Sequence, residues 1–96
     1  MGRHAADILV ELLLAMVMAL VDNEEAIHIA HTEAAGDPDK GIGPTFLFVV
    51  DVDKDDVGKL IGRSGKTAGA LRHILGASSR KLGVRSILNI PDKKGE

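Results

Sequence analysis

Residues 57–67, Val-Gly-Lys-Leu-Ile-Gly-Arg-Ser-Gly-Lys-Thr, are the stretch from which the fold can be worked out. They predict a short helix, a Gly-x-x-Gly turn at residues 62–65, and the start of a longer helix. Because glycine has no Cβ and adopts positive φ, another backbone can come close to such a turn. The N–H groups that open the second helix favour an anion, as do three cations beside the turn, namely Lys59, Arg63 and Lys66. The stretch therefore predicts contact with a polyanionic backbone.

Residues 64–67 also match the end of the nucleotide-binding P-loop, G-x-x-x-x-G-K-[ST]. The first glycine of that pattern would have to stand at position 60, which is Leu60. A P-loop also follows directly after a buried strand, whereas an amphipathic run precedes this turn. We therefore reject a nucleoside triphosphate site.

The composition indicates one small domain without a metal or a cofactor. Ninety-six residues supply a single modest core. There is no cysteine, which excludes disulfides and thiolate metal sites and fits a cytoplasmic protein. The four histidines show no metal-ligand spacing, and His28 and His31 are expected on opposite faces of a strand.

Charge is distributed unevenly along the chain. Residues 1–57 carry three cations and twelve acids, a net charge of −9, whereas residues 58–96 carry nine cations and two acids, a net charge of +7. The two halves add up to the total of −2. Positive charge is thus concentrated on the glycine turn and the chain after it, as in a protein with an anionic partner.

Hydrophobic periodicity predicts six elements in the order α-β-β-α-α-β. The expected ranges are a helix at 7–21, strands at 26–33 and 45–52, helices at 56–61 and 66–82, and a strand at 84–90. Residues 1–6 are expected to be a disordered start and 91–96 a frayed tail, so the domain is predicted to span 7–90. The first helix is shorter than the roughly twenty apolar residues that cross a bilayer, so no membrane contact is expected.

Several details of these elements can also be predicted. Asp7 is a plausible N-cap, and Gly83 is a plausible C-terminal residue of the long helix. The Gly/Pro-rich segment 35–44 should be a floppy loop. The strand at 45–52 has apolar residues on both faces, which suggests a central or well-covered strand. The core side of the long helix is expected to carry Leu71, Ile74, Leu75, Ser78 and Leu82.

The element order, with Leu-Ile-Gly-Arg-Ser-Gly between the fourth and fifth elements, resembles a type II KH domain. The size and the run Leu20-Val21-Asp22-Asn23 are similar to the small bacterial single-KH RNA-binding proteins of the KhpA type. The resemblance covers roughly residues 7–90. It implies an α+β fold in which a three-stranded mixed sheet is packed on one side by three helices.

The resemblance also implies a function, namely binding of single-stranded RNA, or of single-stranded DNA, through a Gly-x-x-Gly backbone clamp of about four nucleotides. Mapped onto this sequence, Gly62 and Gly65 permit close approach, Arg63 and Lys66 neutralise phosphates, and Ser64 completes the turn. The expected track is extended by Lys59 and Arg72, with Ile61 at the edge of the groove. A role as an RNA chaperone or post-transcriptional regulator is implied, as is a homodimer or a heterodimer with another KH-domain protein.

Two functions other than RNA binding are open to this sequence. In the first, the chain is a protein-interaction or assembly module that binds little or no nucleic acid, but three cations at the mouth of the turn argue against it. The second is an enzyme, which no nucleophile, metal cluster or carboxylate pair supports. The acids just before the turn (Asp51, Asp53, Asp55 and Asp56) would repel phosphate if they lined the groove, so we expect them to point away and cap the short helix.

Overall fold

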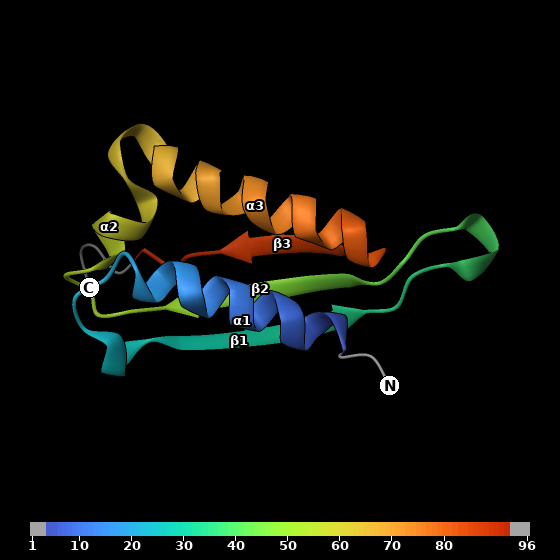
Figure 1. The fold of residues 1–96 in the computed structure, drawn as a ribbon, viewed down its shortest axis with the longest axis horizontal. Helices are drawn as coiled ribbons and strands as arrows, with labels where there is room; N and C mark the ends of the chain where they lie inside the picture. Colours follow the sequence, from blue (N-terminus) through green and yellow to red (C-terminus); the bar gives the residue numbers. More distant parts are fainter. Residues whose placement is uncertain (1–3, 93–96) are drawn as a thin grey trace.

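A computed structural model describes residues 4–92 and has the predicted α+β architecture (Figure 1). The helices are α1 (Ala5–Met18), α2 (Val57–Ile61) and α3 (Lys66–Leu82). Short 3₁₀ turns lie at Glu24–Ala26, Pro38–Lys40 and Arg63–Gly65. The strands are β1 (His28–Ala34), β2 (Thr45–Asp51) and β3 (Arg85–Asn89). All six predicted elements are present, in the predicted order.

The strands form one mixed sheet in the order β1-β2-β3. β1 and β2 pair antiparallel, with Ile29 opposite Val50, while β2 and β3 pair parallel, with Phe48 opposite Leu88. The parallel pair requires a crossover, which α2 and α3 supply. The long helices α1 and α3 pack side by side over one face of the sheet, and α2 sits at the end where β2 stops.

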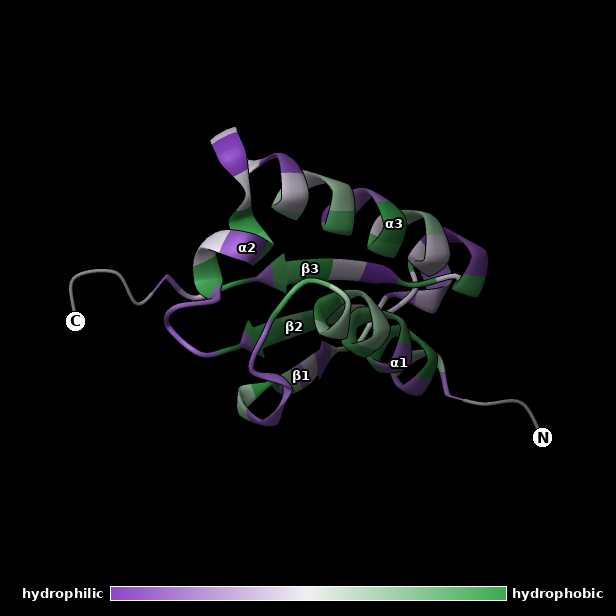
Figure 2. Ribbon diagram, turned by 60° about the vertical axis from the view of Figure 1, so that its left-hand side comes forward, coloured by the Kyte–Doolittle hydropathy of each residue, from purple (hydrophilic) through white to green (hydrophobic). Residues whose placement is uncertain are grey.

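The core lies between this helical layer and one face of β2. Phe46, Phe48, Val50 and Val52 are each at most 2% exposed. Figure 2 shows the apolar residues gathered on β2, β3 and the inner side of α1. β2 is central as expected, but its second face is not covered by any element that the structure describes, and Leu47 there is 37% exposed.

The start of α1 differs from the prediction. The helix begins at Ala5, and its N-cap is His4, whose ring Nδ1 accepts a hydrogen bond from the backbone N–H of Ala6 at 3.2 Å. The predicted N-cap at Asp7 is therefore wrong, because an imidazole supplied the acceptor. Residues 4–6 belong to the ordered domain, while residues 1–3 and 93–96 of the two expected ends lie outside the described part.

The expected floppy loop at 35–44 is instead a narrow extension of the β1–β2 hairpin, which projects from the body of the molecule (Figure 1). Two backbone hydrogen bonds join Asp37 and Ile42 across it, at 2.8 and 2.9 Å. The strands pass so closely here that a Cβ on Gly36 would stand 2.1 Å from the carbonyl oxygen of Ile42. The glycines that suggested a loop in fact allow this close backbone approach.

The core side of α3 also needs correction. Ile74 is 49% exposed, and the residue in the last turns that is buried against the sheet is Ser79 rather than Ser78. Ser79 fits there because its hydroxyl donates to the carbonyl oxygen of Leu75 and lies 2.7 Å from Ser86 Oγ. The polar side chain is therefore satisfied inside the helix–sheet contact. No helix among the described residues is long and apolar enough to cross a membrane.

Candidate nucleic-acid interface

The Gly-x-x-Gly turn joins α2 to α3 at one end of the helical layer (Figure 1). Gly62 has φ 75° and ψ 171°, while Ser64 (φ 56°) and Gly65 (φ 74°) are both left-handed. Among the described residues other than glycine, Ser64 alone has a positive φ. A backbone hydrogen bond from Gly65 N–H to the carbonyl oxygen of Gly62, at 3.1 Å, closes the turn. The turn is tight and its conformation is well defined.

The two glycines have different surroundings. A Cβ on Gly62 would lie 2.2 Å from the Oγ1 of Thr67, so the inner side of this glycine is already filled by the chain itself. A Cβ on Gly65 would meet nothing within 4 Å. Sequence reasoning assigned both glycines to the approach of a ligand. In the structure, Gly62 shapes the turn and Gly65 leaves open space at its surface.

Arg63 and Lys66 are both exposed at this turn. They lie on either side of the left-handed pair Ser64 and Gly65, next to the first backbone N–H groups of α3. A helix N-terminus with two cations beside it is a favourable place for a phosphate. Arg63, Ser64, Gly65 and Lys66 are thus brought together as predicted.

Lys59 is placed differently from the prediction. Its Nζ lies 2.7 Å from a carboxylate oxygen of Asp22 and 2.7 Å from one of Asp56. These hydrogen bonds raise the pKa of Lys59. The side chain ties the loop after α1 to the first turn of α2. Its charge is engaged by two carboxylates, so it acts on the interface chiefly by holding α2 in position.

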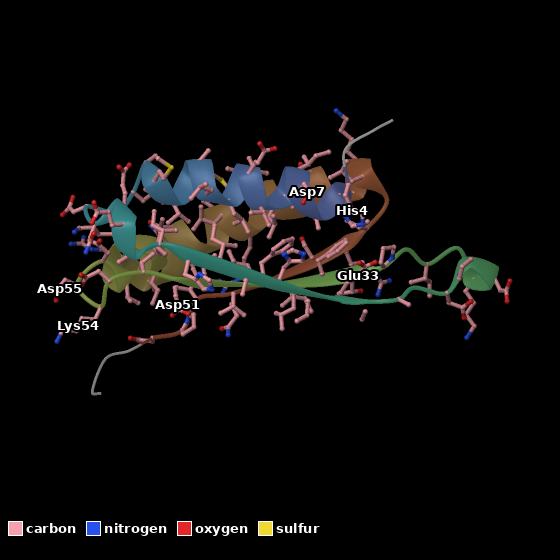
Figure 3. All side chains as sticks on the ribbon, turned by 90° about the horizontal axis from the view of Figure 1, so that it is seen from below. His4, Asp7, Glu33, Asp51, Lys54 and Asp55 are labelled. Atoms are coloured by element: carbon pink, nitrogen blue, oxygen red, sulfur yellow. The ribbon has the colours of Figure 1, made fainter. Side chains whose placement is uncertain are left out.

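Two of the acids before α2, Asp53 and Asp56, hold the loop after α1, and the N-cap residue Asp56 makes no side-chain capping bond to α2. Asp53 accepts hydrogen bonds from Asp55 N–H and Asn23 Nδ2, which lower its pKa. Asp56, only 2% exposed, accepts from Lys59 Nζ and from Asn23 N–H, and its pKa is lowered for this reason. Figure 3 shows Asp51, Lys54 and Asp55 at this end of the molecule. Asp53 and Asp56 therefore fasten the start of α2 to the loop after α1.

Arg72 lies on the side of α3 that faces β3. Its Nη2 donates to the carbonyl oxygen of Leu88 at 3.3 Å. Here a cavity of about 210 Å³, which we call the proximal cavity, is lined by Arg72, Leu75, Ser86, Ile87 and Leu88. Since Arg85 N–H bonds to the carbonyl oxygen of Pro44, just before β2, the alternation of a parallel strand turns the backbone groups of Ser86 and Leu88 away from β2, toward this cavity. Such groups could contact base edges.

The apolar residues near the turn differ in exposure. Leu60 and Leu71 are buried in the core, as is Val50, so none of them offers a surface to bases. Ile61 is half-buried against the core, at the end of α2 where the turn begins. Its position agrees with an edge of the groove. Sequence reasoning missed Ser86 and Ile87, because residues on an edge strand show no motif that marks them.

Among the described residues, no group of three or more His, Asp or Glu could hold a metal ion. The described site consists of a glycine turn, exposed cations, and a groove between a helix and a strand edge. Such an arrangement can bind an extended polyanion.

Comparison with known proteins agrees with this geometry. Residues 10–90 match the family model described as KhpA/KhpB, KH domain. The chain belongs to this family. It is 39% identical to the RNA-binding protein KhpA of Aquifex aeolicus over 71 residues, which cover 74% of this chain and 80% of the relative. It is 34% identical to KhpA of Borreliella burgdorferi over 83 residues, covering 86% and 92% of the two chains. No solved structure matches the chain.

Membership confirms the resemblance to KhpA-like proteins and the type II KH fold. The KhpA family is one of RNA-binding proteins that are not enzymes, so the prediction of a non-enzymatic protein is also confirmed. The mixed sheet, with a parallel β2–β3 pair around the two helices that hold the glycine turn, is the architecture expected for it.

Proposed function

We propose that this protein binds single-stranded RNA by clamping the backbone of the strand with residues 62–65. The observation that carries the proposal is the open, left-handed Ser64–Gly65 pair, flanked by exposed Arg63 and Lys66 at the N-terminus of α3. The names of the relatives, which are RNA-binding proteins, support RNA as the ligand.

The proposed roles follow from position. Arg63 and Lys66 neutralise phosphates, Gly65 lets the strand come close, and Arg72 extends the cationic track along α3. Ile61 lies at the edge of the groove. Lys59 contributes by fixing α2, since its ammonium is already held by two carboxylates.

The test replaces the two central residues of the turn. The variant Arg63→Asp/Ser64→Asp puts two carboxylates where phosphate would lie, and Arg63→Asn/Ser64→Asn is its matched control of nearly equal shape. Both asparagine and aspartate tolerate the left-handed conformation of position 64, so both variants should fold. Circular dichroism checks this.

Binding to short unstructured RNA is then measured across a salt series. We expect the wild type to bind with a log–log salt slope of about −2 to −3, from three or four phosphates at roughly 0.7 each. The Asn/Asn control should weaken binding through the loss of Arg63, and the Asp/Asp variant should abolish it. Equal binding by the wild type and the Asp/Asp variant would refute the clamp and favour the interaction-module alternative.

We also propose that the protein acts as a dimer, with itself or with another KH-domain protein. The support is apolar exposure on the helices, where Leu14 and Met18 lie one turn apart on α1 at 39% and 44% exposed and Ile74 on α3 is 49% exposed. A second clamp on one assembly would raise the effective concentration for a single RNA. Light scattering should give about twice 10.1 kDa for a homodimer, and a monomer mass at high concentration would exclude one.

In the cell we place the protein in the cytoplasm as an RNA chaperone or post-transcriptional regulator. With only two aromatic residues, both buried phenylalanines, the chain has no aromatic platform on which bases could stack. Binding would then depend on backbone charge and shape, with little sequence preference. Such a protein suits the handling of many RNAs better than the recognition of one sequence.

A further inference from the structure

The groove between α3 and β3 does not end at the proximal cavity. A second cavity of about 450 Å³, which we call the distal cavity, lies toward the end of α3 and the start of β3. It is lined by Thr45, Gly76, Ser79, Arg80, Val84, Arg85, Ser86 and Ile87. Ser86 and Ile87 line both cavities, so the two adjoin along β3, and we call them together the α3–β3 groove.

The charge of this groove is one-sided. Arg80 comes from the last turn of α3 and Arg85 from the first residue of β3, so two separate elements present a guanidinium to the distal cavity. With Arg72 in the proximal cavity there are three arginines. None of the described residues that line the two cavities is acidic, although the chain contains fourteen acids. The lining of the groove is therefore cationic, although acids outnumber cations in the whole chain.

The local packing gives the distal cavity a defined shape. Gly76 has no side chain, and the Nη1 of Arg80 lies 3.7 Å from where its Cβ would be, so the guanidinium lies along the wall of the groove. The hydroxyls of Ser79 and Ser86 are joined at 2.7 Å at its base. Ile87, 56% exposed, adds an apolar side. This combination suits a nucleotide, because arginine binds phosphate in bidentate fashion and its plane stacks on bases.

We propose that the distal cavity is a second RNA subsite, which binds nucleotides of the same strand beyond the segment held by the glycine turn. The inference rests on the proposed clamp and extends it. Arg80 stands fourteen residues after Lys66 on one helix, which is roughly 21 Å along its axis. The RNA would follow the groove from the turn, past Arg72, to Arg80 and Arg85. The footprint is therefore longer than the clamped tetranucleotide.

The experiment compares a tetranucleotide and an octanucleotide of one repeated base, by fluorescence anisotropy and by ¹⁵N–¹H NMR. The test variant is Arg80→Gln/Arg85→Gln. The matched control, Lys54→Gln/Lys81→Gln, also removes two charges, from exposed residues that line neither cavity. An octanucleotide offers five positions for a tetranucleotide, so a gain of about fivefold is statistical.

We expect the wild type to gain a further factor of about ten on the octanucleotide, the value of one stacked base or good phosphate contact. The octanucleotide, and not the tetranucleotide, should shift the amides of Gly76 and Arg85. Arg80→Gln/Arg85→Gln should leave tetranucleotide binding unchanged, remove the extra gain, and reduce the salt slope by about 1.4 on the octanucleotide. The control variant should keep most of the gain.

Three results would overturn the subsite. The wild type could gain only the statistical factor, the control could lose as much as the test variant, or the extra gain could persist in Arg80→Gln/Arg85→Gln. In the last case the gain would come from two clamps on one strand. If tetranucleotide binding is observed in any of these cases, the clamp itself stands. If the wild type binds neither oligonucleotide, the clamp and the subsite both fail.

Discussion

The two glycines of the turn should differ sharply in what they contribute to stability. Gly62 has φ 75° and ψ 171°, a region essentially open only to glycine. A Cβ there would also stand 2.2 Å from Thr67 Oγ1 and 2.8 Å from the Thr67 backbone nitrogen. Gly65 has an ordinary left-handed conformation and open space around it.

The magnitudes follow from these environments. For Gly62→Ala, backbone strain of about 1–3 kcal/mol adds to a steric cost of similar size, so we expect a loss of roughly 3 kcal/mol in the free energy of unfolding. For Gly65→Ala only the left-handed conformation matters, and the loss should be about 1–2 kcal/mol. With an m value of about 1.5 kcal/mol/M, the urea midpoints of the two variants should differ by about 1 M.

The assay is urea unfolding followed by circular dichroism at fixed protein concentration, since the chain has no Trp or Tyr to report by fluorescence. Thr67→Ala removes the atom closest to the new methyl group but leaves the backbone nitrogen at 2.8 Å. Gly62→Ala should therefore cost roughly 1 kcal/mol less in the Thr67→Ala background than in the wild type. Equal midpoints for Gly62→Ala and Gly65→Ala, or no coupling to Thr67, would refute the assignment of Gly62 to the shape of the turn.

Three further predictions concern the contacts around the interface. The pKa of Asp56 in the folded protein lies below its usual 3.8. The stability that this carboxylate contributes should therefore be fully present above about pH 5 and be lost as the pH falls through the lowered pKa. In a pH series of urea midpoints, Asp56→Asn should flatten this decline. Lys59→Met removes the cation that pairs with Asp22 and Asp56, so it should lower the urea midpoint at pH 7 while weakening RNA binding by less than about threefold. Arg63→Gln should leave the midpoint unchanged and weaken RNA binding by more than about threefold. Ser79→Ala removes a buried hydroxyl that bonds within α3 and to β3, so the free energy of unfolding measured in urea should fall by about 1 kcal/mol. A loss near zero would contradict this role.

The sequence was sufficient wherever local rules decide the structure. α3 has the predicted bounds, since a glycine turn starts it and Gly83, left-handed at φ 74°, ends it. Apolar residues on both faces of β2 correctly predicted its central place in the sheet, but they could not tell which face is buried. The start of α1 was missed because a histidine took the place of the usual capping residues.

The position of Lys59 shows why the rest of the site could not be predicted. Its place beside the turn in the sequence suggested a phosphate contact, but Asp22, thirty-seven residues earlier, lies within hydrogen-bond distance in the fold. Only the tertiary structure reveals such a partner. The distal arginines were hidden for the same reason, because Arg80 and Arg85 meet only where the end of α3 turns back into β3.

The topology converts the charge pattern of the sequence into a spatial one. α1 and β1 hold only three of the twelve acids of residues 1–57, namely Asp7, Glu11 and Glu33, and the strand order β1-β2-β3 separates β1 from β3. From residue 58 to residue 92, seven cations stand against Asp92 alone among the acids, and these residues make up most of α2, the turn, α3 and β3. A net charge of −2 therefore coexists with a cationic groove. The arginines of the groove attract RNA locally, whatever the total charge of the chain. For this reason the salt dependence of binding should follow the charge of the groove rather than that of the whole protein.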